Sequence, residues 1–419
     1  MAFLMILYST ITQTLYLTPL LTTYLSYIQP AYIVLYWLFF LVYIGDLIAN
    51  HRSITSFELV VLYLLLVPFY LAIPASILWG QSMLYGIAAS REWFLVVAPI
   101  AIFYMFKIKW VTLKEIYDAM LGLGWLYLSI FTAVAILGNP HQYMGTHPPV
   151  YVSCNLAKGA CTYRLDFIAI LFACIYYYIK FLKKNDWRSA IAFLCFLSYL
   201  AFEDKKRALL LALALTLFFI FLTQLPWKKI VLYSVAIIFF LVTAISTIYI
   251  IAPNVIQNYI TMYSNVLTVL EGQKANESSA DVRIYETIEA ITIIQTNPIS
   301  LLIGNGRISD HYNNGQYGNF AHFYPSDIDI IGAVFQYGIV GYIMVQMEYV
   351  YIFYLWWRIK KNKNNLYLKA TFFLLICFFL NGGSMDCFTA GIASTPLFIC
   401  LIYCFVYLEK HESKGYEVP

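Results

Sequence analysis

Long apolar runs recur from one end of the chain to the other, and they constrain the fold more than any other feature. Only 11% of the residues are charged, whereas a soluble globular domain carries about 25%. A bilayer-spanning helix needs roughly 20 apolar residues, and runs such as 231–251 lack the alternation typical of a membrane β-barrel. Lipid offers the backbone no hydrogen bonds, so such runs should be helical. The sequence therefore predicts an all-α polytopic membrane protein.

The runs predict twelve membrane-spanning helices within a single transmembrane domain that covers residues 1–419. The expected spans are 3–25, 31–48, 57–78, 92–108, 116–137, 164–182, 188–203, 208–225, 229–251, 327–357, 366–380 and 388–408. The first run lacks a basic start and a small-residue cleavage site, so it is expected to be a retained span rather than a signal peptide. The run 327–357 is longer than a bilayer requires, which predicts either a surface helix at its start or a strong tilt.

Basic residues orient these spans, because cytoplasmic loops carry an excess of Lys and Arg. One side collects 14 Lys and 3 Arg, which is 17 of the 26 basic residues, and is expected to be cytoplasmic together with both termini. The outer side holds 4 Lys but 5 Arg. The net charge of +4 forms no polybasic block, which argues against a nucleic-acid partner.

The excess of arginine on the outer side runs against the topological rule. The guanidinium group grips phosphate and carboxylate oxygens in a bidentate manner that lysine cannot reproduce. These arginines therefore predict a site for an anionic ligand, with scattered surface ion pairs as the plain alternative. The five residues are Arg91, Arg164, Arg207, Arg283 and Arg307.

Two outer loops are longer than the rest. The smaller, 138–163, contains Cys154 and Cys161, whose spacing on an oxidising face permits either a local disulfide or two free thiols. No Cys and His cluster has the spacing of a zinc site, so no metal is expected. No nucleotide-binding motif is present, and no cofactor is expected.

The larger loop, 252–326, is the most polar stretch of the chain. Within it, Ser278 to Asp281 can begin a helix in which isoleucines recur at helical spacing, and Asn297-Pro298 should end it. The pattern predicts an amphipathic helix on the membrane surface. Arg283 lies near its N-terminal end, where the helix dipole also favours an anion. The turn Gly304-Asn305-Gly306 then permits close backbone approach to a ligand.

Acidic and imidazole side chains follow at the mouth of the next span. His322, Asp327 and Asp329 lie on the same predicted face as the five arginines. A histidine or an aspartate can accept a proton from an attacking hydroxyl, while arginines stabilise a phosphate leaving group. The plainer reading makes His322 an interfacial residue and the aspartates helix caps. Asp329, one turn further in, fits a cap less well.

Taken together, residues 200–345 resemble the bacterial superfamily of O-antigen polymerases (Wzy-type) and O-antigen ligases. The resemblance rests on Arg207 at the start of a central span and on the late outer loop. That loop contains Arg283, Asn297-Pro298, the glycine turn and His322, and leads to Gly338-Ile339-Val340-Gly341. Ligases tend to carry Asn after the histidine, whereas Phe323 follows here, and Lys205-Lys206 replace a serine before the central arginine. These departures favour a polymerase.

The resemblance implies a GT-C-like, metal-independent, inverting glycosyltransferase of the bacterial inner membrane. Its donor and acceptor would be undecaprenyl-pyrophosphate-linked glycans, with a polysaccharide chain-length regulator as a further expected partner. Arg207 and Arg283, helped by Arg164 or Arg91, would hold the pyrophosphate, and His322 or Asp327 would activate the acceptor hydroxyl.

Two other functions stay open at this level. An O-antigen ligase, which transfers glycan to lipid A-core, would use the same donor. A secondary transporter with twelve spans belongs to a different class, but transporters often show internal repeats and midplane charges. Here the two halves show no clear symmetry, and the outer arginines gather at one face.

Overall fold

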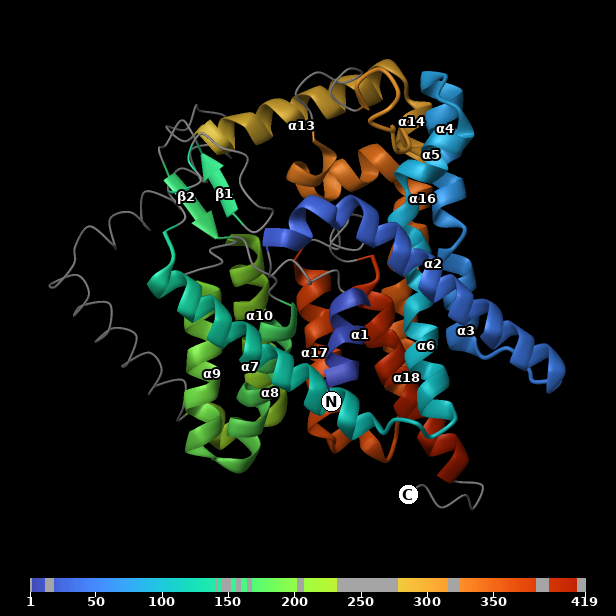
Figure 1. Ribbon diagram of the computed structural model, residues 1–419. Coiled ribbons are helices and arrows are strands. Elements are labelled where there is room, and N and C mark those ends of the chain that lie inside the picture. Colours follow the sequence, from blue (N-terminus) through green and yellow to red (C-terminus); the bar gives the residue numbers. More distant parts are fainter. Residues whose placement is uncertain are drawn as a thin grey trace, which may run out of the picture. The chain divides into compact units, whose positions relative to one another are not determined.

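The computed structural model describes most of the chain. The described residues are 2–11, 19–139, 142, 144, 152–155, 160–163, 168–201, 207–231, 278–315, 324–381 and 392–412. Within them the protein is helical apart from one small two-stranded sheet (Figure 1). The chain forms two compact units. The first comprises Met1–Tyr70, Ser90–Ile220 and Ile343–Pro419, and the second Leu71–Ala89 and Phe221–Tyr342.

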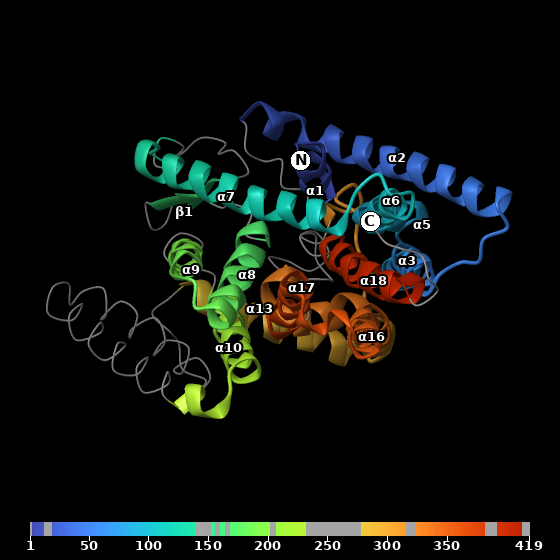
Figure 2. The same ribbon diagram turned by 90° about the horizontal axis from the view of Figure 1, so that it is seen from below.

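The first unit is a helix bundle. Its helices are α1 (Ala2–Ile11), α2 (Pro19–Ala49), α3 (Ser56–Leu64), η1 (Arg91–Val97), α6 (Ala98–Lys107), α7 (Leu113–Leu137), α8 (Ile168–Lys184), α9 (Trp187–Tyr199), α10 (Arg207–Gln224), η5 (Asn362–Asn364), α17 (Leu366–Leu380) and α18 (Ser394–Glu412). Helix α8 packs against α7, α9 and α17, and α17 in turn packs against α18 (Figure 2). Every residue from Ile168 to Tyr176 is buried, so α8 lies in the centre of the bundle.

A stack of aromatic rings ties three of these helices together. The ring of Tyr367 in α17 stacks on Tyr117 of α7 at 4.8 Å and on Tyr176 of α8 at 5.1 Å. Its hydroxyl also donates a hydrogen bond to Asp118 over 2.7 Å. Buried phenol groups need such polar partners, so this contact fixes α17 against α7 in one rotational setting.

The sheet lies in the smaller outer loop. Strands β1 (Val152–Asn155) and β2 (Ala160–Tyr163) pair antiparallel, and the register sets Cys154 opposite Cys161. Cys161 is disulfide-bonded. Of the two readings that the spacing left open, the structure is consistent with a disulfide staple in this loop.

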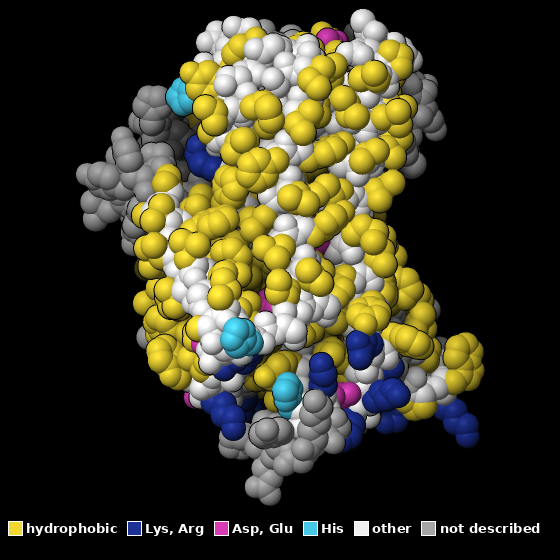
Figure 3. Space-filling model, turned by 90° about the vertical axis from the view of Figure 1, so that its right-hand side faces the viewer, with side chains coloured by type: hydrophobic (Ala, Val, Ile, Leu, Met, Phe, Trp, Pro, Cys, Tyr) yellow, Lys and Arg dark blue, Asp and Glu magenta, His cyan; other side chains and the backbone are white. Residues whose placement is uncertain are grey.

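Several helices have the length and composition of membrane spans. Four helices of the described residues pass that test, or five if the bent pair Met83–Ala89 and Arg91–Lys107 is one span. Helix α2 exposes Leu38, Leu41 and Val42, as a lipid-facing surface would. Figure 3 shows hydrophobic side chains over most of the face in view.

The observed helices follow the expected spans with local differences. Helix α17 matches 366–380, and α7 contains 116–137. The span 57–78 is divided into α3 and α4 (Val67–Trp79), while α5 (Met83–Ala89) is a helix that the sequence did not predict. Most of 229–251 and parts of 3–25 and 388–408 lie outside the described residues.

The second unit contains α5, α13 (Ser278–Thr296), α14 (Ile299–Ile303), η4 (Pro325–Ile328) and the first part of α16 (Asp329–Arg358). As expected, α13 begins at Ser278 and ends before Asn297-Pro298. Its Ala290 packs with Ile308, Ile328 and Phe335 in a small core. Helix α13 therefore lies across the start of α16 (Figure 1).

The long run 327–357 forms α16, which is divided into two parts rather than one straight helix. Gly338 interrupts α16 with φ 66° and ψ 174°, a conformation open almost only to glycine. In an unbroken α-helix each carbonyl oxygen accepts a hydrogen bond from the N–H group four residues later. The break leaves some carbonyl oxygens without that donor. Those of Phe335 and Gln336 accept hydrogen bonds, each 2.9 Å long, from the backbone N–H groups of Asn305 and Gly306.

We predict that Gly338→Ala destabilises the protein. The backbone conformation alone costs a non-glycine residue roughly 1–3 kcal/mol, and the added Cβ would collide with backbone atoms of Leu302, Ile303 and Gly304. Thermal unfolding in detergent measures the loss. Gly45→Ala in α2 is the control, because a Cβ there meets nothing within 4 Å and alanine favours a helix. A Gly338→Ala midpoint equal to that of the control would contradict the assignment.

Candidate active site

The site is built where α13 meets η4, within the second unit. Arg283 and Glu286 project from α13, while Tyr324 and Asp327 belong to the segment that leads into α16. The Glu286 Oε1 atom accepts a hydrogen bond from the Tyr324 backbone N–H at 3.3 Å. This contact brings together two segments that are 38 residues apart in the sequence.

Glu286 is the most unusual side chain of this corner. It is only 1% exposed, and its Oε2 atom has no hydrogen-bond partner among the described residues. A buried carboxylate with a free oxygen is costly, so such groups often mark functional sites. Burial raises the pKa of the Glu286 carboxyl, the nearby charge of Asp327 raises it further, and Arg283 opposes both effects. Among the described residues, this corner brings together the Arg283 guanidinium and the carboxyl groups of Glu286 and Asp327.

The two predicted aspartates differ in their backbone conformations. Asp327 is exposed in η4, and its N–H donates to the Tyr324 carbonyl oxygen at 2.9 Å. Asp329 opens α16 with φ 46° and ψ −123°, a strained conformation for a residue with a side chain. Strain of this kind persists only where the surroundings impose it and is frequent at active sites. A Cβ at Gly332 would collide with the Pro325 carbonyl, so η4 folds tightly onto the first turn of α16.

The glycine turn serves a different purpose from the expected one. A Cβ at Gly304 would meet the backbone of residues 336–338, and one at Gly306 would meet the backbone of Leu71 and Ala75. The close approach is therefore to the chain's own helices, α16 and α4. These contacts explain both glycines without any ligand.

Arg307 follows this turn and is positioned by a residue that the sequence reading did not single out. The side-chain amide of Gln81 donates to the Arg307 carbonyl oxygen at 3.1 Å. Its Oε1 atom accepts from the Ser309 N–H at 2.6 Å. Gln81 is 1% exposed and holds the backbone from the Arg307 carbonyl group to the Ser309 N–H.

The remaining predicted residues are distributed as follows. Arg91 begins η1 in the first unit and is exposed. Arg207 is the first residue of α10, as the sequence predicted for the start of a span. Arg164 and His322 lie outside the described residues. The structure thus brings Arg283 and Asp327 to one corner, and an arginine clamp that includes Arg207 stays a prediction.

Glu286 and Gln81 are the residues that sequence reasoning missed. Glu286 had a usable signal, because it is an acidic residue one turn after Arg283 in a helix with isoleucines on either side. Gln81 had none, since its partners are more than 220 positions away. Among the described residues, no three His, Cys, Asp or Glu side chains form a group that could hold a metal.

Comparison of the chain with protein-family models, with characterised proteins and with solved structures found no match.

We predict that Glu286 makes stability depend on pH. A carboxyl whose pKa is raised by folding favours the native state below its ordinary pKa of 4.5. That contribution is lost as the pH rises through the raised native value. Unfolding midpoints measured between pH 4.5 and 8 should fall in the wild type and fall less in Glu286→Gln. Glu289→Gln, three residues further along α13, is the control and should retain the wild-type dependence of the unfolding midpoint on pH. Identical profiles for wild type and Glu286→Gln would contradict the assignment.

Proposed function

We propose that the protein is a membrane glycosyltransferase of the O-antigen polymerase type. It joins undecaprenyl-pyrophosphate-linked repeat units into a surface polysaccharide at the outer face of the bacterial inner membrane. In this proposal the chain crosses the bilayer twelve times, has a GT-C-like architecture and keeps both termini in the cytoplasm. The apolar helices support a membrane location.

One observation carries the proposal: the contact between α13 and η4 collects an arginine and two carboxyl groups. His322 precedes Tyr324 by two positions in the sequence. Group transfer from a pyrophosphate donor needs a cation for the leaving group and a base for the attacking hydroxyl. Arg283 supplies the first, and His322 or Asp327 supplies the second.

The exposed face of α13 supports a lipid-linked substrate. Val282, Tyr285, Ile288 and Ile291 recur at helical spacing and are each more than 40% exposed. An exposed apolar stripe beside charged groups is typical of a helix that lies in the membrane interface. At that depth a polyprenyl tail can remain in lipid while its pyrophosphate reaches Arg283.

The proposed step is a direct displacement. A sugar hydroxyl of the acceptor attacks the anomeric carbon of the donor, and its proton passes to His322 or Asp327. The bond between that carbon and the pyrophosphate oxygen breaks, and the lipid pyrophosphate leaves with its negative charge held by arginine. A single displacement inverts the configuration at the anomeric carbon. Glu286, buried behind the Tyr324 backbone, positions the segment that carries the base.

We predict that Arg283→Ala and Arg207→Ala each abolish polymerisation. Removing one group that stabilises the transition-state charge costs roughly 10²–10³ in rate. The assay uses purified protein in proteoliposomes with a lipid-linked repeat unit, and product length is read on gels. Lys205→Ala, which removes a neighbouring positive charge, is the matched control and should remain active. Arginine variants with near wild-type activity would overturn the pyrophosphate clamp.

The same assay assigns the base and separates the alternatives. We expect His322→Ala and Asp327→Asn to differ, and the inactive variant identifies the proton acceptor. Transfer of glycan to lipid A-core instead of to a second repeat unit would make the protein a ligase. Solute flux without any glycan transfer would make it a transporter.

A further inference from the structure

A pocket of about 390 Å³ lies within the first unit. Three segments line it: residues 53–56 before and at the start of α3, the last turns of α16, and the last turns of α18. The sequence assigns this end of the unit to the cytoplasmic side, because Arg52, Arg358 and Lys410 belong to the basic face. None of the residues proposed for glycosyl transfer lines this pocket.

The lining is cationic and rich in hydroxyl groups. Arg358 and Lys410 contribute positive charge, and the hydroxyls come from Ser53, Thr55, Ser56, Tyr354 and Tyr403. The Arg358 Nη1 atom donates to the Tyr354 hydroxyl at 2.7 Å, which holds the guanidinium group at the pocket. A planar guanidinium beside an ammonium and several hydroxyls is suited to phosphate oxygens.

The one carboxylate of the lining is already engaged. Glu409 Oε2 accepts the Lys360 N–H at 2.9 Å, and Oε1 accepts the Asn362 N–H at 2.7 Å. The Asn362 side-chain amide adds a third hydrogen bond at 3.3 Å. Glu409 therefore caps the connection between α16 and α17 through both of its oxygens.

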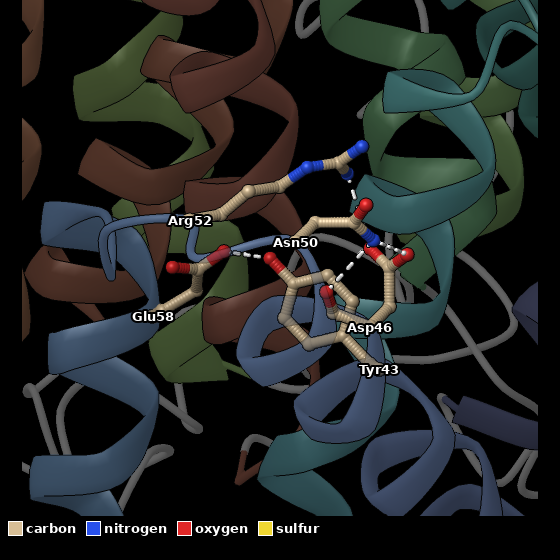
Figure 4. A network of polar contacts seen from close by, with 5 residues as sticks. All are labelled: Tyr43, Asp46, Asn50, Arg52 and Glu58. Atoms are coloured by element: carbon tan, nitrogen blue, oxygen red, sulfur yellow. Dashed lines mark hydrogen bonds and ion pairs between the residues drawn. The ribbon is translucent and has the colours of Figure 1, made fainter.

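A hydrogen-bonded network holds the 53–56 segment in place before any ligand arrives (Figure 4). Arg52 pairs with Asp46 at 3.0 Å, and the Asn50 side-chain amide donates to the same carboxylate at 2.8 Å. Glu58 accepts from the Thr55 N–H and from the Tyr43 hydroxyl. A preformed pocket binds with a smaller loss of conformational entropy.

An apolar stripe along α16 leads to the pocket. Val350, Phe353 and Trp357 recur at helical spacing and are 58%, 51% and 76% exposed. Tryptophan favours the boundary between hydrocarbon and headgroups, and Trp357 is suited to that level of a bilayer. The cations lie at the polar end of this stripe. An amphipathic ligand could place its charged group at the cations and its apolar part along the stripe.

We propose that this pocket binds the phosphate of an anionic phospholipid, with the acyl chains along α16. Arg358 and Lys410 contact the phosphate oxygens, and the serine and threonine hydroxyls complete the site. The proposal is independent of glycosyl transfer, because it concerns other residues and a resident lipid rather than a substrate.

The test uses the delipidated full-length protein in neutral detergent, titrated with short-chain phosphatidylglycerol or phosphatidylcholine while bound lipid is counted by native mass spectrometry. Phosphatidylglycerol should bind about tenfold more tightly, and Arg358→Gln and Lys410→Gln should each weaken it by about tenfold, the usual loss for one charge-assisted contact. The control is Arg188→Gln, since Arg188 also lies over an aromatic ring, Trp187, but outside the pocket.

Each result decides the question. Retained affinity in Arg188→Gln together with losses in both pocket variants supports the site, and thermal unfolding shows whether each variant is folded. Equal binding of the two lipids, or wild-type affinity in a folded Arg358→Gln or Lys410→Gln protein, overturns it. Inorganic phosphate that displaces phosphatidylglycerol at equal concentration would assign the pocket to a free phosphate and overturn the lipid assignment.

Discussion

The break in α16 at Gly338 is the constraint on which the second unit depends. In an apolar environment every backbone carbonyl needs a donor, and a broken helix leaves several without one. The turn at residues 304–306 supplies two N–H groups to Phe335 and Gln336, and its glycines allow the two backbones to touch. These contacts hold the turn against α16. Helix α13 precedes the turn in the chain, and η4 leads directly into α16. The candidate active site lies where α13 and η4 meet.

The carboxylates at the two sites described above accept hydrogen bonds from backbone N–H groups. Glu286 accepts from the Tyr324 N–H, and Glu409 accepts from two backbone N–H groups. Backbone donors order these carboxylates, and an arginine lies near each of them: Arg283 near Glu286, and Arg358 in the same pocket lining as Glu409. The two sites thus share a principle, although one is proposed for chemistry and the other for a resident lipid.

Hydrophobic periodicity and helix signals accounted for much of the fold. The range 366–380 coincides with α17, and the Asn297-Pro298 signal ended α13 where expected. For the candidate site, Arg283 and Asp327 were predicted and lie at one corner. Glu286 and Gln81 were not, because their importance comes from partners far away in sequence. The glycine turn was interpreted as a ligand approach, but its glycines approach α16 and α4, since sequence does not show what a turn will contact.

The sequence by itself determined the helical, membrane-compatible class and the residue types available for binding a phosphate. These properties follow from the composition and from the spacing of apolar residues that lie close together in the sequence. Only the tertiary structure decided that α16 breaks at Gly338, that Glu286 is buried against the Tyr324 backbone, and that Arg358 shares a pocket with Lys410. Each of these depends on contacts between segments tens of residues apart or more, and so on how the helices pack.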